Sequence, residues 1–129
     1  MIELTLKTSQ RAQMLDITDL IESHLPTGFS GAVLAYVPHT TAGITINEGA
    51  DPAVRSDILR RLEELVPRSG DYRHAEGNSD AHIKSSLMGN STLVPVQGGK
   101  LSTGTWQAVF FCEFDGPRNR KLIVELIKE

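Results

Sequence analysis

The sequence predicts an α+β domain built from two packed, mainly antiparallel β-sheets with two main helices and one short helix. Segments with strand patterns outnumber segments with helix patterns, which favours packed sheets with the helices to one side. Most consecutive strand segments are separated by short turns, and short turns favour antiparallel pairing. The 129 residues are enough for a single domain, 1–129, whose core needs no disulfide or metal to hold it together.

The first half of the chain combines alternating strands with one short helix. Ile2, Leu4 and Leu6 alternate with polar residues, which is the period of a half-buried strand. A second strand follows closely and is expected to form a hairpin with the first, and Thr18 or Asp19 then caps the helix. The predicted elements are strands at 2–7 and 14–17, a helix from 18 or 19 to about 25, and strands at 30–37 and 43–48.

The second half contains the longest helix. Asp51 and Pro52 mark its start, because aspartate caps a first turn and proline fits the first helical position. Its apolar residues fall on one face, and Pro67 ends it. These apolar residues are Val54, Ile58, Leu62 and Leu65. The other predicted elements are a short helix that ends at Gly89 and strands at 92–96, 106–114 and 122–127.

Composition and charge exclude several classes of partner. The net charge is −3, no basic run is present and aromatic residues make up only 5%, so the sequence shows no footprint for nucleic acid. No segment approaches the roughly 18 apolar residues of a membrane span. Cys112 is the only cysteine, which fits a reducing compartment, and the N-terminus lacks the features of a signal peptide. We therefore expect a soluble cytoplasmic protein.

The polar segment 71–86 is the first place to look for chemistry. It holds His74 and His82, two of the four histidines in the chain, together with carboxylates, hydroxyls and a lysine. Turn residues precede Ser79, which is expected to cap the short helix. His82 then lies in the first helical turn, where free amides and the helix dipole favour an anion.

Three histidines on different elements are candidate metal ligands: His39, His74 and His82. Imidazole nitrogens with carboxylates nearby are what a Zn²⁺-type site needs. The spacing matches no standard metal signature, so the alternative that each histidine caps or hydrogen-bonds local backbone stays open. His24 at a helix end is interpreted only as a cation near a helix C-terminus.

Hydroxyl and basic side chains are candidate phosphate ligands. Hydroxyls can bind phosphate oxygens while a cation supplies charge, although threonines also favour strands and serines satisfy local backbone. The candidates are Thr40, Thr41, Lys84, Ser85 and Arg118.

Three residues of the strand at 106–114 carry separate expectations. Trp106 is expected to anchor the core, and Cys112 to be a buried, inert thiol. Glu113 is an acid within an apolar run, which has to face solvent, form an ion pair or serve a site.

Three motifs that occur in order resemble the YjbQ family, and the resemblance covers essentially the whole chain. The first is His39-Thr40-Thr41-Ala42-Gly43-Ile44-Thr45-Ile46-Asn47-Glu48. The second is His74-Ala75-Glu76-Gly77-Asn78-Ser79-Asp80-Ala81-His82-Ile83-Lys84-Ser85-Ser86-Leu87. The third is Gly104-Thr105-Trp106-Gln107, followed by Cys112-Glu113-Phe114-Asp115-Gly116-Pro117-Arg118.

The resemblance implies two antiparallel sheets, a homotrimer and the activity of a secondary thiamine-phosphate synthase. That reaction joins a pyrimidine-methyl diphosphate to a thiazole phosphate and releases pyrophosphate. The first functional interpretation is therefore a metal-assisted transferase acting on phosphorylated small molecules. The alternatives are a non-catalytic metal- or metabolite-binding protein and a phosphate-ester hydrolase.

In the transferase interpretation each candidate residue has a role. The three histidines hold a divalent metal of the Zn or Mg class, which neutralises the diphosphate leaving group. Glu48 or Glu113 acts as a further ligand or base, and Lys84, Ser85 and Arg118 position the leaving group.

Overall fold

Two antiparallel sheets are stacked on each other in the computed structural model, which describes all 129 residues and confirms the α+β class. The predicted order of elements is also confirmed, with four strands after the last helix. The elements are β1 (Ile2–Lys7), β2 (Gln13–Asp16), α1 (Thr18–Glu22), β3 (Gly31–Tyr36), β4 (Ala42–Glu48), α2 (Pro52–Leu65), α3 (Ser79–Met88), β5 (Ser91–Gln97), β6 (Lys100–Leu101), β7 (Gln107–Glu113) and β8 (Asn119–Lys128).

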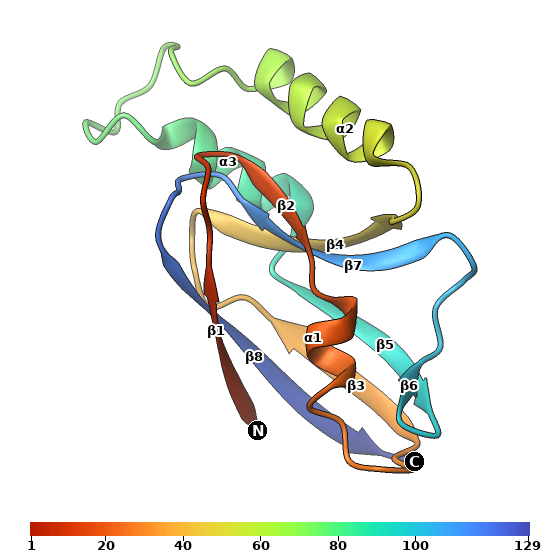
Figure 1. Ribbon diagram of the computed structural model, residues 1–129. Helices are drawn as coiled ribbons and strands as arrows, with labels where there is room; N and C mark the ends of the chain where they lie inside the picture. Colours follow the sequence, from red (N-terminus) through yellow and green to blue (C-terminus); the bar gives the residue numbers. More distant parts are fainter.

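The sheets form two layers, and helices α2 and α3 form a third. The larger sheet has five strands in the order β1-β8-β3-β5-β6, and the smaller has three in the order β2-β7-β4. Figure 1 shows α2 and α3 over the outer side of the three-stranded sheet, with the five-stranded sheet on its other side. None of the three helices combines the length and the apolar character needed to cross a membrane.

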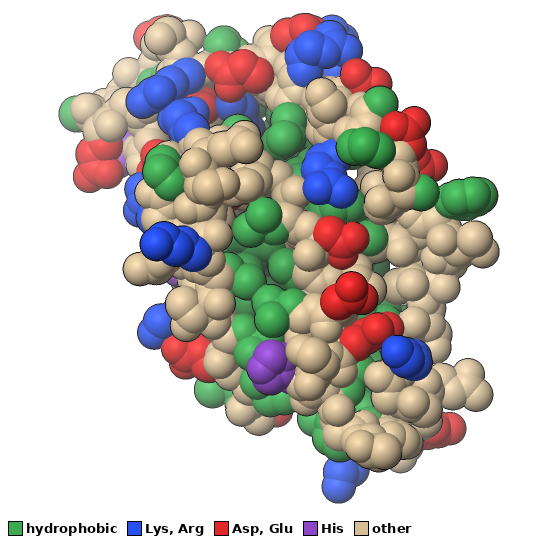
Figure 2. All heavy atoms as spheres, viewed as in Figure 1, with side chains coloured by type: hydrophobic (Ala, Val, Ile, Leu, Met, Phe, Trp, Pro, Cys, Tyr) green, Lys and Arg blue, Asp and Glu red, His purple; other side chains and the backbone are tan.

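The outer face of α2 carries charges of both signs. In the space-filling view, basic and acidic side chains gather at the top of the molecule, over this helix (Figure 2). Arg60 pairs there with Asp57 at 3.3 Å and with Glu64 at 3.2 Å, and all three side chains are exposed. This face is therefore a solvated surface, as the sequence pattern of α2 predicts.

The hairpin expected between the first two strands is wrong, because the chain changes sheet between them. β1 pairs with β8 in the larger sheet, whereas β2 pairs with β7 in the smaller one. β3 and β4 are separated in the same way. Each strand buries its apolar face between the sheets, and that pattern does not specify the sheet to which a strand belongs. The loop 37–41 therefore crosses between the layers, and Glu48 lies at the opposite end of β4 from this loop.

The main core lies between the two sheets. Val33 and Leu122 face inward from the larger sheet and meet Ile44 and Phe111 of the smaller one. A second cluster around Phe110 lies under α2. It is made by Met14, Ala81, Ala108, Phe110, Cys112 and Phe114, with Ile58, Leu59 and Leu62 of α2 and Met88 of α3 packed against it.

Two apolar residues expected to face the core are exposed. Trp106 is 65% exposed because it lies in the turn before β7, where its carbonyl accepts a hydrogen bond from the Gly49 amide. Leu65 is the last residue of α2 and is also exposed. The predicted start of this helix is confirmed, since the Asp51 side chain accepts from the Ala53 amide at 2.9 Å.

The larger sheet leaves its outer side uncovered (Figure 1). Alternation along β3 buries Val33 and Ala35 and turns Leu34 and Tyr36 outward. Leu93, which pairs with Leu34, is 59% exposed. We call the apolar residues of this side the outer apolar face; they are Leu34, Tyr36, Leu93, Pro95, Ile123 and Ile127.

Candidate functional site

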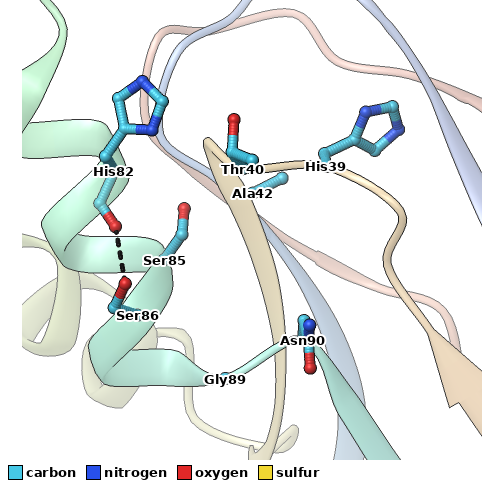
Figure 3. Close-up of a pocket in the computed structure, with 8 residues that line it drawn as sticks. All are labelled: His39, Thr40, Ala42, His82, Ser85, Ser86, Gly89 and Asn90. Carbon is cyan, nitrogen blue, oxygen red and sulfur yellow. Dashed lines mark hydrogen bonds between the residues drawn. The ribbon is translucent and has the colours of Figure 1, made fainter.

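A cavity of about 490 Å³ lies between the loop before β4 and the helix α3 (Figure 3). We call it the first cavity. Four of the residues expected to form a site line it, namely His39, Thr40, His82 and Ser85. The complete lining is His39, Thr40, Ala42, His82, Ser85, Ser86, Gly89 and Asn90.

The C-terminal end of α3 is fixed against β4 and the end of β3. The Gly89 carbonyl accepts from the Ile44 amide at 3.0 Å, and the Asn90 carbonyl accepts from the Val37 amide at 2.7 Å. Gly43 permits this approach, because a Cβ there would lie 2.6 Å from the Gly89 carbonyl oxygen. Gly89 itself has a φ of +90°, which confirms its expected role at the helix end. Rigid elements thus hold both walls of the first cavity.

His39 is oriented by the neighbouring strand β8. Its Nε2 accepts a hydrogen bond from the Lys121 amide at 2.9 Å, so in the neutral ring the proton is on Nδ1. Burial and the positive charge of Arg120 lower the pKa of His39, which keeps the ring neutral at pH 7. His39 therefore offers an N–H donor at Nδ1, and its one lone pair is already used.

Among the other side chains of the cavity, some already make hydrogen bonds with the protein and others do not. Ser85 Oγ donates to the Ala81 carbonyl and Ser86 Oγ donates to the His82 carbonyl, so both hydroxyls have only lone pairs left for a ligand. In Figure 3 the rings of His82 and His39 lie on opposite sides of the cavity, with Thr40 between them. The His82 ring makes no hydrogen bond and contacts the His74 ring edge-on at 5.4 Å between centroids.

Behind the loop that carries His39 lies a buried ion pair. Arg120 is 3% exposed, and its Nε donates to Glu113 Oε1 at 2.9 Å. Arg120 Nη2 donates to the carbonyl and the hydroxyl of Thr41, at 3.2 and 2.8 Å. Thr8 Oγ1 also donates to Glu113 Oε1 at 2.8 Å. Glu113 and Thr41 thus tie the loop to β7 and β8 and do not line the first cavity.

Lys84 lies on the buried side of α3 and is 2% exposed. Its Nζ donates to Asp80 Oδ2 at 2.8 Å and pairs with Glu63 of α2, while Arg11 donates twice to Asp80 at 3.1 Å. Burial opposes ionisation of Asp80, but the hydrogen bonds from Arg11 and Lys84 outweigh it and lower its pKa to about 2. The ammonium group is thus committed to joining α3 to α2, and it is not part of the cavity lining.

We expect Asp80→Asn to destabilise the protein by about 3 kcal/mol, because the buried Lys84 would keep only the partly exposed Glu63 as an anion and Arg11 would lose its carboxylate partner. Because the folded-state pKa lies below the unfolded value of 3.8, the stabilisation by Asp80 is full above about pH 4 and is lost as pH falls toward 2. Urea unfolding at pH 7 measures the change. Asp57→Asn, at an exposed acid of α2, is the control and should have little effect. Equal losses in the two variants would contradict this role of Asp80.

The cap expected at Ser79 is wrong. Asn78 precedes the first helical residue, its carbonyl accepts the amides of Ala81 and His82 at 3.0 and 3.4 Å, and its side chain donates to Asp115. The two amides expected to be free for an anion are therefore already bonded.

The remaining expected site residues lie outside the first cavity. Glu48 accepts from the Asp51 amide at the far end of β4. Arg118 donates to the carbonyl and the carboxylate of Asp115, at 2.8 and 3.0 Å. His74 lies on the far side of His82, within 3.5 Å of Glu76.

The histidines do not gather into a metal centre within one chain. No group of three or more His, Cys, Asp or Glu side chains is placed to hold a metal ion. His74 and His82 supply two imidazoles, but the hydrogen bond from Lys121 uses the lone pair of His39. The donor set of a single chain does not fit a three-histidine metal site.

The family model described as "UPF0047 protein YjbQ-like" matches residues 2–129. The chain belongs to the YjbQ family. YugU of Bacillus subtilis is 53% identical over 127 residues, which cover 96% of each chain. The UPF0047 protein MJ1081 of Methanocaldococcus jannaschii is 51% identical over 124 residues, covering 95% of this chain and 90% of that protein.

Solved structures of YjbQ relatives share the fold. A YjbQ/UPF0047 protein from Clostridium acetobutylicum is 51% identical with a TM-score of 0.93, and covers 98% of this chain and 100% of its own. The conserved hypothetical protein TT1486 from Thermus thermophilus is 46% identical with a TM-score of 0.95 and the same coverage. These names state a family and no activity, so the chemistry of this YjbQ chain rests on the geometry of its site.

Two important residues of this YjbQ chain were missed by sequence reasoning. Arg120 shares its strand face with Leu122 and Val124, so the alternation itself signals an inward-facing cation that needs a buried acid. Asn90 has no such signal, because only the pairing of its carbonyl with Val37 brings it to the first cavity.

Proposed function

We propose that this protein is a transferase acting on phosphorylated small molecules, with the first cavity as its reaction site. The observation that carries the proposal is that one cavity is lined by two histidines, of which His39 is held by a hydrogen bond and His82 is not. His39 is a fixed N–H donor, whereas the His82 ring has no protein hydrogen-bond partner and both of its nitrogens are available to a ligand. A single histidine positioned as general acid or base typically contributes 10²–10⁴-fold to a rate.

The resemblance to secondary thiamine-phosphate synthases supplies the candidate reaction. The bond between the pyrimidine methylene carbon and the diphosphate oxygen breaks, and its electron pair leaves with pyrophosphate. The lone pair of the thiazole nitrogen forms the new carbon–nitrogen bond. His39 Nδ1–H, the Thr40 hydroxyl and the Asn90 amide are the donors available to the leaving oxygens. No lysine or arginine lines the cavity, so the proposed role of His82 is to give a proton to the departing pyrophosphate oxygen as general acid.

An assay with both candidate substrates tests this proposal against its alternatives. A transferase forms thiamine phosphate and pyrophosphate only when both substrates are present. A phosphate-ester hydrolase releases phosphate from one substrate alone, and a binding protein binds a substrate without turnover. If no thiamine phosphate forms at millimolar concentrations of both substrates, the proposed synthase reaction is wrong.

Metal binding stays a prediction. A divalent ion of the Zn or Mg class at His74 and His82 needs further donors beyond these two rings, such as water, a substrate phosphate or a second chain. Elemental analysis of the purified protein measures the content directly. His74→Ala and His82→Ala should each lose the ion, whereas full metal content in both variants would remove these residues as ligands. A cytoplasmic location also stays a prediction.

The proposed assembly is a homotrimer in which the outer apolar face is covered by neighbouring copies. Uncovered apolar patches of this kind commonly mark interfaces. Sedimentation at micromolar concentration should show one species of three chains, and Leu93→Lys should shift it toward monomer because a charge enters the apolar contact. Leu87→Lys is the matched control, since Leu87 is similarly exposed but lies on α3. A monomeric native protein would contradict the trimer.

A further inference from the structure

A second cavity of about 500 Å³ lies on the other side of His82, between the segment 71–74 and the start of α3. His82 lines both cavities, so the two compartments share one wall. The second cavity contains an aromatic ring, an exposed apolar side chain and a cation, whereas the first has only polar donors and acceptors with one alanine. The two compartments therefore suit different parts of a reaction.

Tyr72 provides a fixed aromatic wall. Its hydroxyl donates to the Pro67 carbonyl, and its ring packs on Gly70, where a Cβ would lie 3.1 Å from the ring. A loop aromatic held at both its hydroxyl and its ring is organised in advance for stacking. Ile83 is 40% exposed on α3 and lines the same cavity, which adds apolar surface.

Arg73 supplies a free cation at the rim. It is exposed, and its guanidinium makes neither a hydrogen bond nor an ion pair with the protein. Asp71 lines the same cavity and balances this charge. With one free cation and one acid in its lining, the cavity favours a ligand with one acidic group over a polyanion such as pyrophosphate.

We propose that the second cavity binds a planar aromatic or heteroaromatic ring bearing a single anionic group. The ring stacks on Tyr72 against Ile83, and the anion pairs with Arg73. This inference rests on the proposed function in one respect, since it makes the second cavity the compartment of the ring-bearing reactant. His82 then contacts both compartments, because it lines each of the two cavities.

Phenyl phosphate is a suitable probe, because it has a ring and one phosphate and undergoes no transfer. Titration calorimetry of the native protein should show binding at millimolar concentration, and inorganic phosphate should bind at least about tenfold more weakly because it cannot stack. Tyr72→Leu and Arg73→Gln should each weaken phenyl phosphate binding about tenfold. Tyr72→Phe should retain most of it, because the ring remains.

Arg68→Gln is the matched control. Arg68 is an exposed arginine of the same connection between α2 and α3, but it does not line the second cavity. If phenyl phosphate binds equally well to Tyr72→Leu and to Arg73→Gln, the proposed ring-binding site in the second cavity is wrong. Absence of binding to the native protein at about 10 mM, where even weak ligands register, would overturn it as well. Thermal melts verify that the variants fold.

The experiments distinguish a failure of the ring-binding proposal from a failure of the transferase proposal. Phenyl phosphate binding that depends on Tyr72 and Arg73 supports the compartment even when no joined product forms in the two-substrate assay. Conversely, normal turnover with an unchanged KM for both substrates in Tyr72→Leu overturns the compartment while the transferase proposal stands.

Discussion

Replacing His82 by alanine is expected to lower turnover in the two-substrate assay by about 10²–10⁴-fold. His82 is the ring in the first cavity that no protein hydrogen bond holds, and it lines both cavities. Its removal takes away the proposed acid–base group of the first cavity. Stability should change little, since the ring makes no hydrogen bond with the protein and meets the His74 ring only edge-on.

His24→Ala is the matched control for this prediction. His24 is exposed just after α1, where its ring bonds to the Leu20 carbonyl and Ser23, and it lines neither cavity. Its removal should leave turnover unchanged. Equal activity in His82→Ala and the native protein would exclude acid–base chemistry at His82.

Glu113→Ala is expected to destabilise the fold by about 3–5 kcal/mol, because Arg120 would remain buried without its carboxylate. Both side chains are almost fully buried, and an uncompensated buried charge is strongly unfavourable. The double variant Glu113→Leu/Arg120→Met should recover much of the loss, because apolar residues of similar volume replace both charges. Urea unfolding measures both effects.

The same variants separate a structural role of Glu113 from a catalytic one. Glu3→Ala is the control, since Glu3 pairs with Lys121 at the surface and its loss should hardly change stability. Native stability in Glu113→Ala, combined with loss of turnover, would contradict the structural role and return Glu113 to the candidate bases.

The strands and the fold class were predictable because some strands alternate, as β1 does, and others are short apolar runs bounded by turn residues, as β7 is. The assignment of strands to sheets was not, since β1 and β2 have similar patterns but lie in different sheets. The helix from Pro52 was predictable from its cap, whereas the exposure of Leu65 was not, since this last residue of α2 lies outside the cluster against which the rest of the helix packs.

The candidate site was only partly predictable for a related reason. His39, Thr40, His82 and Ser85 were identified as site residues, and the structure brings them to one cavity. Lys84 looked like a free cation in the sequence, but its partner Glu63 lies on another helix. The chemical groups that lie close together along the chain can be read from the sequence. The partner with which a side chain pairs depends on the tertiary structure.

The most direct test of the account is ¹⁵N NMR of the imidazole rings during titration with pyrophosphate. We expect the free protein to show His39 as the neutral ring with its proton on Nδ1, because Nε2 accepts from Lys121. Pyrophosphate should then shift the His39 and His82 signals together and leave those of His24 in place. A His39 ring protonated on Nε2, or His39 and His82 signals as insensitive to pyrophosphate as those of His24, would contradict the first cavity as the reaction site.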